Sequence, residues 1–127
     1  MAYRKFQADY LFTGINLMDN TSVLITNEKG VIEDIVDYEQ AGEGVEIFSG
    51  ILSPGFINTH CHLELSHLKN KIPEKTGLTN FVYKVVTERH FPPKEIVPAI
   101  RIATEEMLQN GIVAIGDICN NDLALSV

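Results

Sequence analysis

Short blocks rich in β-forming residues alternate with polar turns over the first fifty residues. The blocks read ADYLFTG, SVLITN, VIEDIVDY and VEIFSGIL. In the turn between the second and third blocks, Gly30 can take the positive φ that closes a tight hairpin. The pattern predicts a meandering antiparallel sheet, and we find no residues suited to chemistry in it.

The pattern changes at Pro54-Gly55, a pair that marks a boundary. The segment FINTHCHL that follows predicts a strand, and a polar loop leads from it into a region of helical spacing. We expect Thr79 to be the N-cap of a first helix and Pro92-Pro93 to end it. Its apolar face comprises Leu78, Val82, Val85 and Val86.

A second helix is expected from Pro93 to the stop signal Asn110-Gly111. Its apolar positions recur at helical spacing: Ile96, Ile100, Ala103 and Met107. The segment IVAIGDI then predicts a strand buried on both faces of a parallel sheet. The order of strand, two helices and strand predicts a βαβ unit after residue 54.

Composition and charge restrict the class of protein. The chain has 127 residues, of which 45% are hydrophobic and 21% charged, as in a globular protein. A net charge of −7 argues against a nucleic-acid surface, and no apolar run is long enough to span a membrane. The N-terminus lacks the apolar core of a signal peptide. Cys61 and Cys119 are isolated, which predicts reduced thiols in a cytoplasmic protein.

Two histidines near the end of the FINTHCHL segment are the strongest sign of chemistry. Residues two apart in a strand point to the same face, so His60, His62 and Glu64 share a side and Cys61 faces away from it. Two neutral imidazoles at a strand end can bind one divalent metal ion. A His-x-His pair also occurs by chance with a purely structural role, but carboxyl ends of parallel strands are where sites are built.

The segment LSPGFINTHCHLELSHL resembles the signature of the amidohydrolase superfamily, in which a Pro-Gly-Phe turn leads into the first barrel strand. The run Glu64-Leu65-Ser66-His67 is more similar to the deaminase and chlorohydrolase-like branch, which includes relatives of aminodeoxyfutalosine deaminase. The leading strands resemble the small β-sandwich domain of that family, and NGIVAIGDI resembles its second barrel strand.

This resemblance implies an α/β fold: part of a β-sandwich over residues 1–53, then the first strand–helix units of an incomplete (β/α)8 barrel over residues 54–127. It also implies that His60 and His62 bind a divalent metal ion, zinc first and iron as a second choice. Such an ion lowers the pKa of a bound water, so that hydroxide attacks a carbon bearing nitrogen. The implied activity is hydrolysis of a non-peptide C–N bond, by deamination of a small aminated molecule.

Three further residues are candidates for substrate contact, each with an ordinary alternative. Glu64 lies on the ligand face of the strand, but it could be a solvated loop carboxylate. His67 could be a polar surface residue, and Asp117, at the end of the second strand, could be a loop or capping residue. We expect His90 to be structural.

The length of the chain is the main departure from the family. A (β/α)8 barrel takes roughly 250 residues, whereas only residues 55–127 follow the boundary. The further metal ligands and the proton-transfer residues come from later strands in the family, so we expect no catalytic residue and no activity within these residues alone. Exposed strand edges should favour self-association.

A second interpretation belongs to a different class of protein. The chain could be a small non-catalytic domain in which His60 and His62 are structural and the β-rich surface serves binding or assembly. The sequence does not specify the substrate or the metal, because loops after later strands decide the first and imidazoles alone do not select the second.

Overall fold

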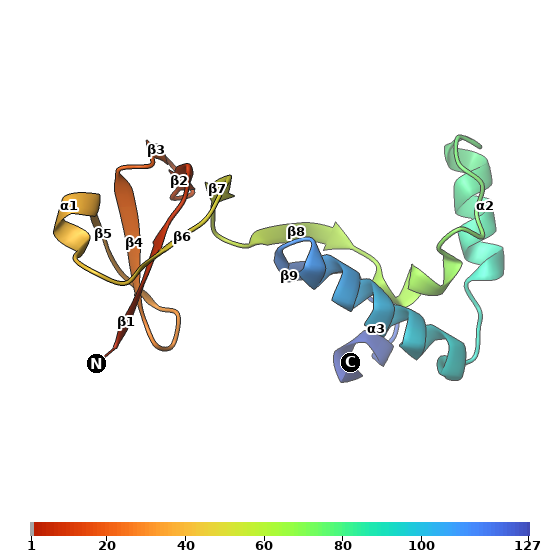
Figure 1. The fold of residues 1–127 in the computed structure, drawn as a ribbon. Coiled ribbons are helices and arrows are strands. Elements are labelled where there is room, and N and C mark those ends of the chain that lie inside the picture. The colour runs from red at the N-terminus through yellow and green to blue at the C-terminus, as the bar shows by residue number, and fades with distance from the viewer. Residues whose placement is uncertain (1) are drawn as a thin grey trace. The chain divides into compact units, whose positions relative to one another are not determined.

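The computed structural model describes residues 2–127, which form two compact units (Figure 1). The first unit ends at Pro54 and the second begins at Gly55. The structure is mixed α/β, as predicted. That the two units correspond to a β-sandwich segment and a barrel segment stays a prediction.

The first unit contains two sheets and one short helix. The four-stranded sheet has the order β5-β4-β1-β6, and the three-stranded sheet has the order β3-β2-β7. The strands of the first sheet are β1 (Tyr3–Gln7), β4 (Ser22–Asn27), β5 (Ile32–Asp37) and β6 (Val45–Ile47). Those of the second are β2 (Tyr10–Phe12), β3 (Leu17–Asp19) and β7 (Ile51–Leu52).

The predicted antiparallel meander is wrong. Strand β1 pairs with β6 in parallel, and β2 pairs with β7 in parallel, while the remaining pairs are antiparallel. The predicted strand VEIFSGIL is in fact two strands in different sheets, with a bend at Ser49-Gly50 between them. Strand β1 was not predicted, because its sequence YRKFQ has two adjacent basic residues and no β-branched side chain.

The hairpin of β4 and β5 forms as predicted. Gly30 has φ of 78°, and its N–H donates to the carbonyl of Asn27, 3.0 Å away. After β5 the chain forms helix α1 (Tyr38–Ala41) in place of the expected strand end and loop. The buried apolar side chains of this unit come from the strands, α1 and a loop: Ala8, Leu11, Val23 and Ala41. Val23, on β4, has no exposed surface and is the most deeply buried of these four residues.

The second unit has the predicted order of strand, two helices and strand, with two short 3-10 helices added. Its strands are β8 (Phe56–Cys61) and β9 (Ile112–Asp117), and its α-helices are α2 (Leu78–Glu88) and α3 (Pro93–Gln109). The 3-10 helices are η1 (Leu63–Leu68) and η2 (Leu123–Ser126). Strands β8 and β9 pair in parallel, which confirms the βαβ prediction.

Helix α3 and the 3-10 helix η1 supply the core of this unit. Leu63, Ile96 and Ile100 are buried together, and Cys61 packs against them. The predicted ends of α3 are confirmed, with Pro93 in the first turn and Asn110 as C-cap. Residues on α3 therefore fix the position of the segment that follows β8.

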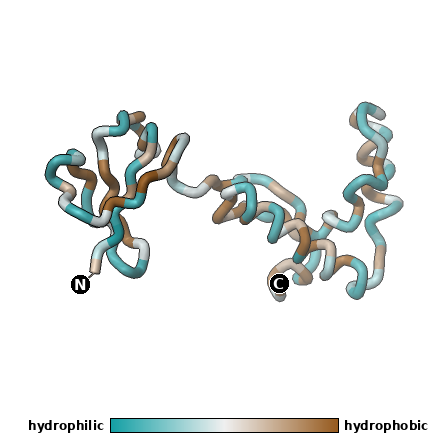
Figure 2. The backbone as a smooth tube through the Cα atoms, in the orientation of Figure 1, coloured by the Kyte–Doolittle hydropathy of each residue, from teal (hydrophilic) through white to brown (hydrophobic). Residues whose placement is uncertain are grey.

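Two expectations for this unit are wrong. Gly77, not Thr79, is the N-cap of α2, because the helix begins one residue after this glycine. No residue of α2 is buried in the part of the chain that the structure describes, although hydrophobic and hydrophilic residues alternate along it (Figure 2). The second wrong expectation is that β9 is buried on both faces, since Val113 on this strand is 64% exposed. Among residues 2–127, no helix combines the length and hydropathy that crossing a membrane requires.

Candidate functional site

The two histidines of the His-x-His pair lie together at the carboxyl end of β8. The centroids of the His60 and His62 rings are 5.1 Å apart, and the ring planes meet at 79°. Both residues are exposed. His60 belongs to β8, whereas His62 follows it with an extended φ of −135° and precedes η1. The strand alternation therefore brings the two rings to one place.

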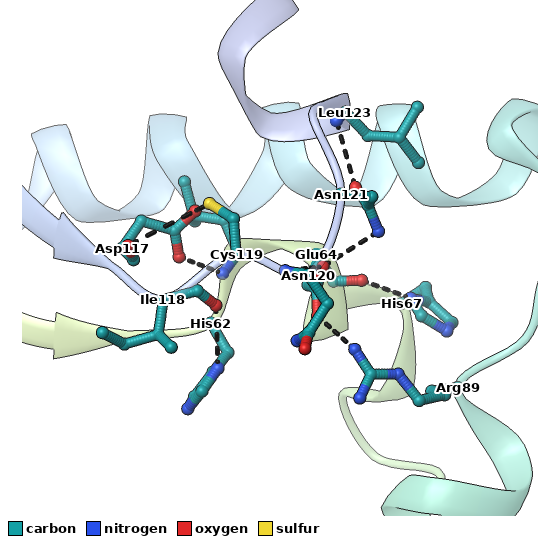
Figure 3. Close-up of polar contacts among 11 residues, drawn as sticks. His62, Glu64, His67, Arg89, Asp117, Ile118, Cys119, Asn120, Asn121 and Leu123 are labelled. Atoms are coloured by element: carbon teal, nitrogen blue, oxygen red, sulfur yellow. Dashed lines mark hydrogen bonds and ion pairs between the residues drawn. The ribbon is translucent and has the colours of Figure 1, made fainter.

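The ring of His62 is fixed by a backbone carbonyl of the loop after β9. Its Nδ1 lies 3.0 Å from the carbonyl oxygen of Ile118 (Figure 3). A carbonyl oxygen can only accept, so we assign the proton to Nδ1. The other ring nitrogen, Nε2, then carries a lone pair. This is the arrangement in which protein imidazoles bind metals, with one nitrogen donating to a carbonyl and the other facing the ion.

The donor set of this strand end fits part of a metal site. Two exposed imidazoles, one with its tautomer fixed, are suitable ligands for zinc or another divalent first-row ion. Within residues 2–127, no group of three or more His, Cys, Asp or Glu side chains lies close enough together to hold one ion. A zinc ion with the usual three protein ligands would need a donor beyond His60 and His62.

Glu64 lies just beyond the histidines, and its side chain is buried. Only 1% of the side chain is exposed. The Arg89 guanidinium and the Asn120 side-chain amide donate to Oε1. The Asn120 backbone N–H and the Asn121 side-chain amide donate to Oε2, each at 2.9 Å (Figure 3). The alternative of a solvated loop carboxylate is therefore wrong.

Burial and hydrogen bonding act in opposite directions on the Glu64 carboxyl. Desolvation alone raises the pKa of Glu64, because it disfavours the charged form. The donors from Asn120, the Arg89 charge and the Asn121 contact hold the pKa below its ordinary value. Glu64 is thus a buried, ionised carboxylate with one cationic partner.

Asp117 ends β9 and ties it to the segment after His62. Its Oδ1 accepts the backbone N–H of Leu63 at 2.8 Å, and the thiols of Cys61 and Cys119 also donate to the carboxylate. Burial raises the pKa of Asp117, but these three hydrogen bonds and the nearby His62 bring it below its ordinary value. The Asp117 side chain therefore bridges two adjacent strand ends.

The two cysteines are free and lie on either side of the Asp117 carboxylate. The hydrogen bond to Asp117 raises the pKa of Cys119 to about 11. Burial, followed by the Asp117 charge, raises the pKa of Cys61. Both groups are therefore neutral thiols near pH 7, and neither is suited to nucleophilic attack.

His67 is buried rather than on the surface, so the polar-surface alternative is wrong. Its Nδ1 lies 3.0 Å from the Glu64 carbonyl oxygen, and its ring packs on Phe91 with centroids 4.9 Å apart. The buried Nε2 has no hydrogen-bond partner among the described residues. His90 is exposed. The structure therefore brings His60, His62 and Asp117 to adjoining strand ends, and it places Glu64 and His67 on η1 rather than on β8.

Three residues of this site were not predicted from the sequence. Arg89, Asn120 and Asn121 bind the Glu64 carboxylate, although Arg89 is 25 residues away from it along the chain. The polar run Asn120-Asn121-Asp122 after a strand was a usable signal, since such loops lie next to the preceding parallel strand. Nothing local marked Arg89.

The sequence model of the amidohydrolase family matches residues 51–125, which include the whole of this site. The chain belongs to the amidohydrolase family. Members of this family generally bind a metal ion. The resemblance stated from the His-x-His segment is thereby confirmed.

Two curated relatives of this amidohydrolase are named 5-methylthioadenosine/S-adenosylhomocysteine deaminase. That of Natronomonas pharaonis is 28% identical over 99 residues, covering 76% of this chain and 22% of the relative. That of Lawsonia intracellularis is 26% identical over 109 residues, covering 80% of this chain and 24% of the relative. The chain thus spans less than a quarter of the length of these relatives.

Solved structures of the same fold include two of special relevance. The Helicobacter pylori aminofutalosine deaminase, in complex with methylthio-coformycin, has a TM-score of 0.73 at 21% identity, covering 97% of this chain and 31% of that one. An amidohydrolase from Brucella melitensis has a TM-score of 0.67 at 17% identity, covering 90% and 26%. At these identities the likeness shows the fold.

Proposed function

We propose that this amidohydrolase chain contributes to a metal-dependent deaminase, with His60 and His62 as two ligands of one divalent ion. Zinc is the first choice of metal and iron the second. The observation that carries the proposal is the convergence of the two rings, with centroids 5.1 Å apart, at the carboxyl end of β8. The hydrogen bond from His62 Nδ1 to the Ile118 carbonyl supports it, since it leaves Nε2 to bind.

The proposed reaction is hydrolytic removal of an amino group from a small molecule. The names of the two curated relatives, which are deaminases of adenosine-type compounds, support an aminated ring as the substrate class. A bound divalent ion supplies water activated near neutral pH. His60 and His62 hold and orient that ion, and the Ile118 carbonyl keeps the His62 proton on Nδ1.

The finer architecture belongs to the same proposal. The seven short strands of the first unit support a β-sandwich segment, and the parallel pair of β8 and β9 supports the start of a (β/α)8 barrel. Because the described residues offer no third ligand at the histidine pair, we propose that residues 1–127 alone do not catalyse the reaction.

Substrate contact by Glu64, His67 or Asp117 stays a prediction. The carboxylates of Glu64 and Asp117 already accept several protein donors, and His67 is buried.

The two free thiols support the expectation of a cytoplasmic location.

Self-association is also proposed for the isolated chain. Phe56, Ile57 and Val113, on the paired strands β8 and β9, are 62%, 65% and 64% exposed. Exposed apolar side chains on neighbouring strands favour contact with a second copy or with further chain. Sedimentation velocity over a range of concentrations would test this, and a monomer at every concentration would contradict it.

Zinc titration of the chain tests the central proposal. Zinc affinity is measured by competition with a chromophoric chelator. Losing a hydrogen-bond partner of a metal ligand weakens metal binding by about 10–100-fold. We expect His60→Ala and His62→Ala, which remove a ligand itself, each to weaken zinc binding by more than this. His90→Ala is the matched control, because His90 is exposed and lies on the segment between α2 and α3. In a longer protein that carries this sequence, the same two variants should lose deaminase activity.

Zinc affinity equal to that of His90→Ala in both variants would contradict the proposal. The non-catalytic binding domain would then be the better interpretation of the chain.

A further inference from the structure

We propose that Glu64 is a positioning residue for His62, acting through the loop after β9. Its buried carboxylate holds that loop so that the Ile118 carbonyl keeps the His62 proton on Nδ1. The inference rests on the proposed function only in giving His62 the role of a metal ligand.

Reciprocal hydrogen bonds join the segment after β8 to the segment after β9. Asp117 accepts the N–H of Leu63, and Glu64 accepts the N–H of Asn120. Each carboxylate thus binds the backbone of the opposite segment. Between these two bonds, the Ile118 carbonyl meets His62 (Figure 3). The hydrogen bond between His62 and Ile118 is therefore flanked along the chain by two side-chain-to-backbone bonds, one made by Asp117 and one by Glu64.

The Glu64 carboxylate has no capacity left for another donor. Two carboxylate oxygens offer about four acceptor positions, and Arg89, Asn121 and both Asn120 groups occupy them. The side chain is also buried, with only 1% of its surface exposed. These contacts favour a role in fixing the loop over a direct contact with substrate.

The strand ladder holds Ile118 from one side only. Its N–H donates to the Cys61 carbonyl at 2.8 Å, which continues the pairing of β8 and β9 by one residue. Beyond Ile118 the loop is held by the Cys119 thiol, which donates to Asp117, and by the bonds of Asn120 and Asn121 to Glu64. Without the bonds to Glu64 only the thiol contact remains beside Ile118, and the Ile118 carbonyl can move away from the imidazole.

The consequence for His62 is a change of tautomer. A neutral imidazole carries its proton on either nitrogen, and the hydrogen bond made by one nitrogen decides which. If the Ile118 carbonyl leaves, the proton is free to move to Nε2, and the lone pair needed for a metal is then lost from that position. Glu64 would thus act on His62 without contacting its ring.

The test is nitrogen-15 NMR of the imidazoles in the metal-free chain at about pH 8.5, where histidine is mostly neutral. For the unmodified chain we expect a single His62 tautomer, with Nδ1 protonated and Nε2 free. In Glu64→Gln we expect that signature to be lost, with both nitrogens moving toward the averaged values of a mixture. Glu105→Gln on α3, an exposed residue, is the matched control and should leave the spectrum of His62 unchanged.

A milder variant separates positioning from folding. Asn121→Ser removes the amide that donates to Glu64, adds no charge beside that carboxylate, and keeps an oxygen that can accept the Leu123 N–H. We expect a partial shift of the His62 signals with backbone amide signals otherwise native. Unchanged His62 signals in a folded Glu64→Gln would overturn the proposal. Loss of the folded spectrum in both variants would also overturn it, since Glu64 would then act through stability alone.

Zinc affinity separates this inference from the proposed function. If both are right, Glu64→Gln shifts the tautomer and weakens zinc binding by about 10–100-fold. If the tautomer shifts while His62→Ala leaves zinc binding intact, the metal-ligand role fails and the positioning role stands. If His62→Ala abolishes zinc binding while the tautomer is insensitive to Glu64→Gln, the positioning role fails alone.

Discussion

Among residues 2–127, each unit of this chain has an arginine–glutamate pair, and the two pairs differ in burial. Arg4 on β1 and Glu46 on β6 meet at 3.0 Å, with side chains 59% and 45% exposed. Arg89 and Glu64 in the second unit have side chains 24% and 1% exposed. The same two residue types thus form a surface pair in one unit and a largely buried pair in the other.

The difference in burial decides what each pair does. Water screens an exposed pair, which contributes about 0–1 kcal/mol to stability. A buried charge cannot be left without its partners, so removing one side of a buried pair costs about 3–5 kcal/mol. The Glu64 carboxylate also binds Asn120 and Asn121, so its loss would leave several donors unpaired. Burial therefore marks the polar contacts that hold the candidate site.

The largest expected effect is that of Glu64→Ala. This variant should lower the free energy of unfolding of the second unit by about 3–5 kcal/mol, because Arg89 and the two asparagines lose their acceptor. Glu46→Ala, the matched change in the exposed pair, should cost at most about 1 kcal/mol. Urea unfolding followed by circular dichroism measures both. Equal costs for the two variants would remove the contrast between the pairs.

A smaller effect is expected from Gly116→Ala on β9. A Cβ at Gly116 would lie 2.6 Å from the backbone oxygen of Thr59 on β8, and a backbone atom cannot swing aside. We expect a loss of about 1–3 kcal/mol in the free energy of unfolding, with a shift of β8 beside His60. The measurement is again urea unfolding.

Gly30 in the first unit is the control for this prediction. It has φ of +78° but nothing within 4 Å of an added Cβ, so only the backbone conformation opposes a side chain. Asparagine tolerates that conformation, so Gly30→Asn should cost little. Gly116→Asn should be as destabilising as Gly116→Ala, because its Cβ meets the same backbone oxygen of Thr59. A harmless Gly116→Ala would mean that the two strands are not held as closely as the structure shows.

The sequence was sufficient for the elements whose pattern is local. The ends of α3 follow from Pro93 and from the Asn110-Gly111 stop, and the hairpin of β4 and β5 follows from Gly30. The parallel partners of β1 and β2 could not be predicted, because β6 and β7 lie about forty residues away and pairing of short strands leaves no local signal.

The candidate site shows the same limit. Strand alternation predicted the convergence of His60 and His62, which depends on neighbouring residues. The burial of Glu64 depends on Arg89 and Asn120, which only the fold brings near it. A glutamate after a strand looks solvated when its distant partners are unknown. Residue type and spacing therefore suggested the proposed ligands His60 and His62, whereas the residues that hold the surrounding loop required the structure.

The smallest expected effect concerns Asp19, an exposed carboxylate of the first unit. Hydrogen bonds from the Thr21 hydroxyl at 2.6 Å and the Thr21 N–H at 3.0 Å lower the pKa of Asp19 below its ordinary value. A carboxyl group with a lowered folded-state pKa stabilises the fold above its unfolded pKa of about 3.9. That stabilisation is lost as the pH falls through the folded-state value.

Asp19→Asn should therefore lower the thermal midpoint slightly at about pH 6, and its difference from the unmodified chain should shrink as the pH falls through the folded-state pKa. Thr21→Val tests the cause, because it removes the hydroxyl that contributes most to the lowered pKa. Its acid-dependent loss of stability should be smaller than that of the unmodified chain and complete at a higher pH, because the folded-state pKa of Asp19 then lies closer to the unfolded value. A midpoint difference for Asp19→Asn that does not change with pH would show that the exposed carboxylate acts through its shape rather than its charge, unlike Glu64.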